Sequence, residues 1–514
     1  MAISFLPELP VYTLLVLLAL PLYYLYFGAS SRWKNPVALP RNWPILHMFP
    51  SFVANIHNLH DYYTRILARS GHNFRAHGPP GSGIRLFVTC DPANVRHIFT
   101  TNYTNFPKGA EFAAIFDIMG GTLFTIDGEP CRRQRAKVKA VLSSPPIVAR
   151  FAACCRDKLE TSLLPIFSHM ASTGTPFNMQ EMMSRCMFDL AATPLFGVDP
   201  GLLSLDMPSM DAALAMDTVM EVGHYRHVMP TYCWKLMRWL NIGTERKLGI
   251  AHMVLRGFIL DMMERRTTDR CNACSDEEQD GVDIVSSFVN DPDYADFGLF
   301  RAAMISLMLG ARDTISTTLT WTFYNLAQNS NIVTIIRNEL SPIASRKMAS
   351  GLGAMLIFEP DETKSLLYLA AALYETLRLY PPAPVERKTA AANDFMPSGH
   401  EVHAGDTIFI CLHSMGRMET LWGKDCLDYN PARWLSEDGN SLIYAPSHKF
   451  LAFNSGPRMC LGKDIAMMQM KIIIATVVWN FDVQMVEGQS IEPKRSCLLE
   501  MKNGLIVKIT KRQM

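Results

Sequence analysis

The stretch FNSGPRMCLG, residues 453–462, constrains the chain more than any other part of the sequence. At its centre is Cys460. A free cysteine has a pKa of about 8.5, so a thiolate needs neighbours that stabilise its charge. The glycines of the stretch let backbone N–H groups approach the sulfur, and a helix predicted from Lys463 points its positive end at it. Arg458 is expected to add a cation nearby. The stretch therefore predicts a thiolate held against a metal.

The spacing F-x-x-G-x-R-x-C-x-G separates Cys460 from the other cysteines of this chain, which has 12. Most intracellular cysteines are small buried apolar side chains. This spacing resembles the haem-binding loop of the cytochrome P450 (haem-thiolate) family. The resemblance implies a mainly α fold with small β-sheets, haem b with Cys460 as the iron ligand, and Phe453, Gly456 and Arg458 among the residues that hold the cofactor.

A second motif, GARDT at 310–314, lies within an apolar helical run. Gly310 leaves room beside the helix for a planar group or for O2, and Thr314 can bond a preceding carbonyl and loosen the helix. A bent core helix is the alternative reading. The resemblance implies that Gly310 borders the cofactor and that Asp313 and Thr314 form a catalytic acid–alcohol pair that relays protons. The family usually has Ala-Gly where this chain has Gly310-Ala311, and we expect Ala311 to narrow the space above the iron.

Two further motifs concern structure. Glu375 and Arg378 stand three apart in LYETLRLYPP, where they can form an ion pair, and PARW follows at 431–434. Exposed pairs of this kind are common and weak. The resemblance implies instead that Glu375, Arg378 and Arg433 act together as a structural unit that braces the cysteine loop.

The segment DGEPCRRQRAKVK, residues 127–139, is locally basic. The family has Trp-x-x-x-Arg here, and the resemblance implies that Arg135 binds a haem propionate, although Cys131 replaces the Trp. A solvated helix face is one reading of the basic side chains. The other is a docking patch for an acidic flavoprotein reductase.

The 514 residues divide into three predicted parts: a membrane anchor at 1–31, a Pro-rich linker at 32–50 and a catalytic domain at 51–514. The run 11–27 is apolar and uncharged, and basic residues follow it, which predicts a single-pass anchor with the catalytic domain facing the cytosol. A cleaved signal peptide is the alternative. The net charge of +1 argues against a nucleic-acid partner.

Within the catalytic domain we expect strands at 86–90 and 406–411, mostly helices over 129–345, and a last helix from Lys463 to Trp479. The polar segment 267–281 is expected to interrupt the helices as a surface loop. It contains Cys271 and Cys274, but a zinc site would need a second pair of ligands.

The substrate is indicated by resemblance alone. Residues 106–112, Arg312 and residues 413–435 are similar to the plant clan of fatty-acid ω-hydroxylases and mid-chain alkane hydroxylases. This implies hydroxylation of a long aliphatic substrate, with O2 and electrons from NADPH through cytochrome P450 reductase, at the endoplasmic reticulum membrane. Apolar residues near the motifs are candidate substrate contacts, with core packing as the alternative: Phe112, Met304, Met308, Val385 and Leu498.

Three other functions stay open. One branch of the clan performs oxidative phenol coupling in alkaloid synthesis, although Asp313 favours hydroxylation. A haem-thiolate isomerase would need no proton relay. A membrane haem-binding protein or sensor without turnover is the third.

Overall fold

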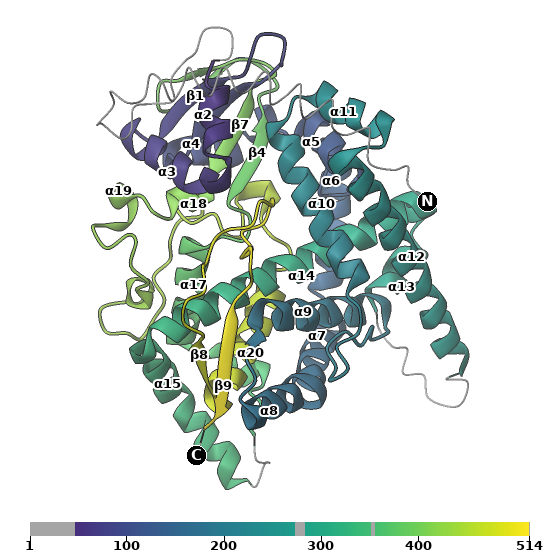
Figure 1. Cartoon of the computed structure of the whole chain (residues 1–514), viewed down its shortest axis with the longest axis vertical. Helices are drawn as coiled ribbons and strands as arrows, with labels where there is room; N and C mark the ends of the chain where they lie inside the picture. Colours follow the sequence, from purple (N-terminus) through teal and green to yellow (C-terminus); the bar gives the residue numbers. More distant parts are fainter. Residues whose placement is uncertain (1–46, 273–282, 351–354, 513–514) are drawn as a thin grey trace, which may run out of the picture.

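The computed structural model describes residues 47–272, 283–350 and 355–512. In these ranges the chain is mainly helical with three small sheets, as predicted. The four-stranded sheet lies at one end of the molecule, and α14 crosses the middle (Figure 1). The predicted anchor and most of the predicted linker lie outside the described residues. At the end of that linker, α2 begins at Phe49, because Pro50 sits in the first turn, where a missing N–H costs little.

The longest helix, α14 (Phe297–Gln328), carries the GARDT motif and is buried along most of its length. The carboxylate of Asp296 caps it by accepting from the N–H of Leu299 at 2.7 Å. Among the helices that pack against it are α9 (Met179–Phe196), α17 (Leu367–Leu379) and α20 (Lys463–Asn480). The predicted last helix is therefore confirmed, and it lies beside the motif helix in the interior.

The other helices surround this centre. In chain order they are α2 (Phe49–Ala54), α3 (Leu59–Arg69), α4 (Pro92–Arg96), α5 (Gly109–Ile115), α6 (Gly128–Leu142), α7 (Pro145–Lys158), α8 (Leu164–Thr173), α10 (Asp211–Val228), α11 (Thr231–Leu240), α12 (Gly243–Asn272), α13 (Ile284–Val289), α15 (Ser330–Ala349), α16 (Pro360–Lys364), α18 (Leu412–Met415) and α19 (Glu419–Trp422).

The predicted start of the surface loop at 267 is wrong, because α12 continues to Asn272. The hydroxyls of Thr267 and Thr268 donate to the carbonyls of Met263 and Glu264, at 2.9 and 3.1 Å, so these polar side chains are satisfied within the helix. Cys271 is exposed on this helix, and Cys274 lies outside the described residues.

The four-stranded sheet has the order β1-β2-β7-β4. Its strands are β1 (Asn73–His77), β2 (Arg85–Thr89), β7 (Thr407–Cys411) and β4 (Val385–Thr389). The two predicted strands, β2 and β7, pair in parallel with Leu86 opposite Thr407, and the outer strands are antiparallel to them. Every residue of β7 is buried, as its apolar, β-branched composition predicts for a central strand. A second sheet joins β3 (Phe177–Asn178), β9 (Ile506–Lys511) and β8 (Phe481–Met485), and β5 (Asp394–Phe395) pairs with β6 (Glu401–Val402).

Among the described residues, no single helix has both the length and the apolar character to cross a membrane. Only α6 taken together with residues 145–173 meets those criteria, and that pair is bent by 62°.

Buried apolar side chains form separate clusters. One surrounds α20, a second fills the space between α10, α12 and α14, and a third lies under the four-stranded sheet. A cavity between the second and third clusters is lined from both sides.

Candidate active site

The loop that carries Cys460 is fixed by backbone contacts. The N–H of Cys460 donates to the carbonyl of Phe453 at 2.8 Å. Gly456 has φ +57°, and a Cβ added there would lie 2.1 Å from the carbonyl oxygen of Phe99. A side chain at this position would strike backbone, so glycine is required by packing as well as by φ. The loop ends where α20 begins, at Lys463, as the sequence predicts.

Opposing influences act on the Cys460 sulfur. The residue as a whole is exposed, but protein atoms crowd the sulfur, and this burial raises the pKa of the thiol. The N–H of Gly462 and the positive charges of Arg135 and Lys463 act in the opposite direction, towards a lower pKa. A bound metal cation deprotonates a coordinating thiol outright. Burial outweighs the N–H group and the two cations, so the pKa of the thiol is raised on balance, and a thiolate at this position needs the charge of a bound metal.

Arg458, predicted to add a cation near the sulfur, donates to the carbonyls of Leu123 and Ile126, at 3.0 and 2.6 Å, and to the carboxylate of Asp127 at 2.5 Å. The carboxylate and the two carbonyls hold the guanidinium in a charge-assisted network. Arg135, expected at a propionate, donates through Nη2 to the carbonyl of Met459. Cys131, which replaces the expected Trp, is buried with its sulfur 3.6 Å from the Leu123 carbonyl.

Buried cations near this loop leave polar atoms unsatisfied by the described residues. Lys388 Nζ and Arg458 Nε are buried without a hydrogen-bond partner there. Lys388 lies 3.6 Å from Glu386, and Lys108 lies over the rings of Phe112 and Phe124 at 4.3 and 4.2 Å. Burial lowers the pKa of Lys108 to about 8. A haem carries two carboxylates. The unsatisfied donors Lys388 Nζ and Arg458 Nε suit binding to such a dianion.

One face of α14 presents the second motif to the cavity. Gly310, Asp313 and Thr314 line it, together with Ser306 and Leu309. A Cβ at Gly310 would meet nothing within 4 Å, so this face is open. Thr314 Oγ1 donates to the Gly310 carbonyl at 2.8 Å, as predicted. Ala311 is not among the cavity-lining residues, so the expectation that it narrows the space is wrong: in the order Gly-Ala, the residue that faces the cavity is the glycine.

Asp313 is a buried carboxyl with one oxygen paired and one free of partners among the described residues. Its Oδ1 accepts from Arg312 at 2.8 Å, while Oδ2 has no hydrogen-bond partner there. Burial raises the pKa of Asp313 to about 7, with the positive charge of Arg312 acting against the shift and the charges of Asp217 and Glu500 adding to it. Arg312 also donates to Asp217 and to Ser184, at 2.8 and 2.5 Å. A carboxyl with a pKa near neutrality can both donate and accept a proton.

The cavity has a volume of about 220 Å³ and runs between α14, α10, α3 and strand β4. Most of its lining is apolar, with contributions from Phe112, Phe116, Met220, Phe409 and others. Lys108, Glu386 and Arg387 line it as charged residues.

The predicted substrate contacts divide into two groups. Phe112, Val385 and Leu498 line the cavity. Met304 and Met308 do not: both are fully buried in the cluster between α10, α12 and α14. The cavity face of α14 follows a spacing of three and four from Ser306, which turns both methionines to another face.

The predicted structural unit forms around Glu375, which is fully buried. Its oxygens accept two bonds from Arg378, at 2.8 Å each, one from Arg433 Nε at 2.9 Å and one from Trp434 Nε1 at 2.9 Å. Arg378 also donates to the carbonyls of Gly416, Cys426 and Asp428. These bonds fasten α17 to the segment 416–434. Trp434 also packs against Phe450, three residues before the cysteine loop, with ring centroids 4.7 Å apart.

The basic segment lies on α6, and acidic residues neutralise part of it. Lys137 pairs with Asp291 and Asp293 at 2.7 and 2.6 Å, and Arg133 pairs with Asp293 at 3.3 Å. The sequence could not show this, because both acids come from a segment about 150 residues away. Lys139 is exposed, and Arg132 pairs with the exposed Glu129.

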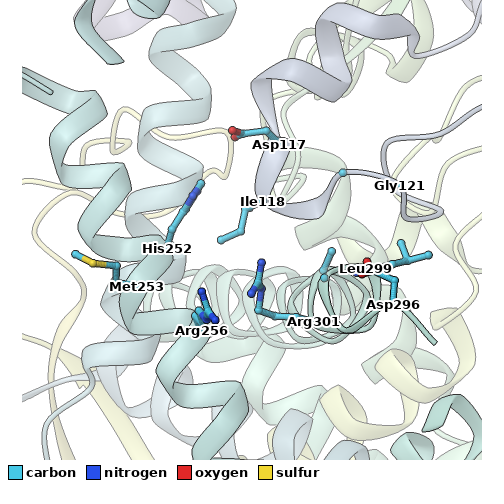
Figure 2. A pocket seen from close by; sticks show the side chains of 12 residues that line it. Asp117, Ile118, Gly121, His252, Met253, Arg256, Asp296, Leu299 and Arg301 are labelled. Carbon is cyan, nitrogen blue, oxygen red and sulfur yellow. Dashed lines mark hydrogen bonds between the residues drawn. The ribbon is translucent and has the colours of Figure 1, made fainter. Parts of the chain in front are cut away.

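A second hollow, open and about 670 Å³ in volume, lies between α12, η4 (Asp117–Met119) and the start of α14. In Figure 2, His252 and Arg256 from α12 face Ile118 and Arg301. None of the residues from the four sequence motifs lines it.

A cysteine loop prepared for a metal, with an acid–alcohol pair on the helix that lines an apolar cavity, defines a haem-thiolate oxidoreductase. The sequence profile described as Cytochrome P450 matches residues 37–509. Noroxomaritidine synthase 1 of Narcissus pseudonarcissus is 35% identical over 492 residues, which is 94% of this chain and 93% of the relative. Alkane hydroxylase MAH1 of Arabidopsis thaliana is 34% identical over 489 residues, covering 93% and 95%. Cytochrome P450 86B1 of the same plant is 34% identical over 494 residues, covering 94% and 87%.

The chain belongs to the cytochrome P450 family and is a monooxygenase, an oxidoreductase whose family membership implies a haem iron held by a cysteine thiolate.

Lys108 and three histidines, His60, His224 and His227, are among the cavity residues for which the sequence predicted no role. Lys108 lies within the stretch 106–112 that carried the resemblance. The pair at 224 and 227 has i, i+3 spacing on a helix, a signal that identifies one face of α10 but not what that face contacts.

Proposed function

We propose that this monooxygenase hydroxylates a long aliphatic substrate, derived from an alkane or a fatty acid, with O2 and electrons from NADPH. The observation that carries the proposal is the cavity itself, where the open face of Gly310, Asp313 and Thr314 meets a wall that is largely apolar. An apolar wall binds an alkyl chain through area removed from water. The relative named alkane hydroxylase adds support, because it matches this chain over nearly its whole length.

The proposed residue roles follow from position. Cys460 holds the iron of haem b, and Lys108, Lys388, Arg458 and Arg135 supply donors for its carboxylates, with Phe453 and Gly456 shaping the loop. When bound, the haem supplies the activation of O2 that inserts one oxygen atom into a C–H bond.

The protein itself manages protons at this site. Asp313 Oδ2 is the proton donor, because its partner-free position and raised pKa let it carry a proton near neutral pH. Thr314 is the next residue in the chain. Its Oγ1 donates to the Gly310 carbonyl, and this hydroxyl can rotate about its bond. The apolar wall excludes water, so protons enter through this pair.

We further propose that the enzyme works at the endoplasmic reticulum membrane, with its catalytic domain facing the cytosol and with NADPH–cytochrome P450 reductase as its partner. The exposed side chains of α11 and the turn after it are unusually apolar for a surface helix: Tyr232, Leu236, Trp239, Leu240 and Ile242. Trp239 is 80% exposed. Such a helix suits contact with a lipid interface. Arg132 and Lys139 on α6 offer positive charge to an acidic partner.

The test begins with the iron ligand. The reduced, CO-bound spectrum of the haem-loaded enzyme is expected to show the red-shifted band of a thiolate ligand. Cys460→Ser should lose this band, and Cys271→Ser, a change at another exposed cysteine, should keep it. A wild-type band at the ordinary protein-haem position would remove Cys460 as the ligand.

The substrate is tested next. The enzyme with a reductase is incubated with alkanes, fatty acids and phenolic amines, and the products are identified by mass spectrometry. Hydroxylated aliphatic products that require NADPH are expected. Product formed without NADPH would point to the isomerase instead.

Oxidative phenol coupling is the second candidate. A specific observation favours it: three histidines line the cavity, which gives it more polar character than a plain alkane uses. A coupled phenolic product, with aliphatic substrates left unchanged, would establish this alternative.

A further inference from the structure

Three imidazoles line the same cavity, His60 from α3 and His224 and His227 from α10. His227 Nδ1 lies 2.7 Å from the carbonyl of Gly223, so its ring is held by its own helix. The other two rings make no hydrogen bond with any residue in the described part of the chain. One nitrogen of each, His60 Nδ1 and His224 Nε2, is also shielded from water. Two polar rings at a cavity wall are thus left without partners.

These two rings belong to a different part of the wall from the catalytic pair. Helix α3 lies beside the four-stranded sheet, whereas α14 crosses the middle of the molecule (Figure 1). The other cavity residues of α3 and α10 are Leu59, Tyr63, Met220 and Val228, besides His227. None of these carries a charge at neutral pH. Among the cavity residues that α3 and α10 contribute, the imidazoles are therefore the strongest hydrogen-bonding groups.

Both imidazoles are neutral. Burial lowers the pKa of His60 to about 3 and that of His224 to about 4. Arg417 and Arg495 contribute to these shifts as positive charges, but neither lines the cavity. A neutral imidazole has one donor and one acceptor nitrogen. Because His60 Nδ1 and His224 Nε2 are shielded, one nitrogen of each ring is left to reach a bound group, as a donor or as an acceptor. A buried carboxylate would need a paired cation, and the cations that line the cavity, Lys108 and Arg387, come from segments other than α3 and α10.

We propose that His60 and His224 bind a neutral polar group, a hydroxyl or a carbonyl, at the end of an otherwise aliphatic substrate that is remote from the carbon oxidised. The proposal rests on the proposed function, because it names the substrate class within that same cavity. A site built to hydrogen-bond a substrate group discriminates strongly against the analogue that lacks it, since its own polar atoms are then left unpaired. The preferred substrate is therefore an oxygenated chain and not a plain alkane.

The experiment compares three ligands of equal carbon number: an alkane, its primary alcohol and the fatty acid. Binding to the full-length, haem-loaded protein is measured by the absorbance shift of the haem and by isothermal titration calorimetry. The alcohol is expected to bind about tenfold more tightly than the alkane, the value of one net hydrogen bond. His60→Leu and His224→Leu should each remove most of this preference, with alkane binding at least as tight as in the wild type, because leucine adds apolar surface to the cavity.

Two controls separate hydrogen bonding from shape. His252→Leu makes the same change on α12, at the separate open hollow of Figure 2, and should alter neither ligand. His224→Gln keeps a donor and an acceptor and should retain much of the preference. Equal binding of alcohol and alkane by the wild type would overturn the proposal. The proposal would also be overturned if the leucine variants weakened the binding of alcohol and alkane equally, or if the fatty acid bound more tightly than the alcohol.

Failure of the proposed function gives a different result. If no aliphatic ligand binds but a phenolic amine does, the aliphatic function is wrong, and the comparison moves to that phenol and its methyl ether. Loss of the preference for the phenol in the leucine variants would then support the imidazole site. An unchanged preference would overturn it.

Discussion

At the scale of single residues, Asp313 is the group whose environment departs most from that of an ordinary aspartate. Desolvation outweighs the neighbouring Arg312 and places its pKa at about 7, so the carboxyl is protonated below that pH. A proton donor works only in its protonated form, so product formed per NADPH consumed should fall as the pH rises through 7.

Asp313→Asn cannot titrate, and we expect it to lose this pH dependence and to form roughly tenfold less product per NADPH at pH 6. Asp313→Glu keeps a carboxylic acid, so its product formed per NADPH consumed should still fall as the pH rises. Both quantities are measured by product analysis alongside NADPH oxidation. A wild-type yield that is flat from pH 6 to 8 would contradict the role of Asp313.

Gly456 makes a second residue-scale prediction, about the loop that carries the cysteine. Gly456→Ala places a Cβ 2.1 Å from the Phe99 carbonyl oxygen, and neither backbone segment can yield without moving the loop. Gly439 is a matched control, because it has a similar positive φ of +72° but open space around it. We expect Gly439→Ala to cost about 1 kcal/mol of folding free energy and to keep the thiolate band. Gly456→Ala should lose most of the band in the CO spectrum. Equal behaviour of the two variants would mean that only φ matters.

At the scale of elements, Glu375 joins α17 to the segment 416–434 through ion pairs that are buried, in contrast to the exposed i, i+3 pair considered from the sequence. Glu375→Gln removes the charge and leaves Arg378, itself fully buried, without its counterion. Breaking a buried pair in this way costs about 3–5 kcal/mol. Thermal unfolding should therefore occur at a clearly lower temperature.

The matched control has the same spacing at the surface. Asp361 and Lys364 form an i, i+3 pair on α16 with side chains 89% and 77% exposed. Asp361→Asn should change the folding free energy by less than about 0.5 kcal/mol. A Glu375→Gln variant as stable as this control would show that the cluster contributes little.

Some features of the helices and strands could be predicted from the sequence, and others could not. The start of α20 and the buried strand β7 follow from local pattern, and both were predicted. The GARDT motif identified the cavity face of α14 at Gly310, Asp313 and Thr314, but the apolar turns before it gave no signal of which of their residues share that face. Arg312 fixes the rotation of α14 through Ser184 on α9 and Asp217 on α10, contacts between residues about 100 positions apart. Met304 and Met308 were assigned to the wrong face for this reason, and His60 and His224 were not assigned at all.

At the scale of the whole molecule, the charge balance of the surface differs from that of the sequence. Residues 127–139 look strongly basic, yet the acids at 291 and 293 neutralise Arg133 and Lys137. The cations left to attract an acidic reductase are Lys139, which is exposed, and Arg132, which pairs with an equally exposed glutamate. Any electrostatic docking on α6 should therefore depend on these two side chains.

The double variant Arg132→Glu and Lys139→Glu reverses that charge. We expect the KM for the reductase to rise several-fold at low ionic strength, because long-range attraction accelerates association. The difference should shrink as salt is added, since the Debye length falls to about 10 Å at 0.1 M. Steady-state turnover at increasing reductase concentration, repeated across a salt series, gives both quantities. Lys364→Glu makes a charge change of the same kind on α16 and should leave the KM unaltered. A change in KM that persists at high salt would mean that the α6 variants disturb packing, and the docking surface would then lie elsewhere.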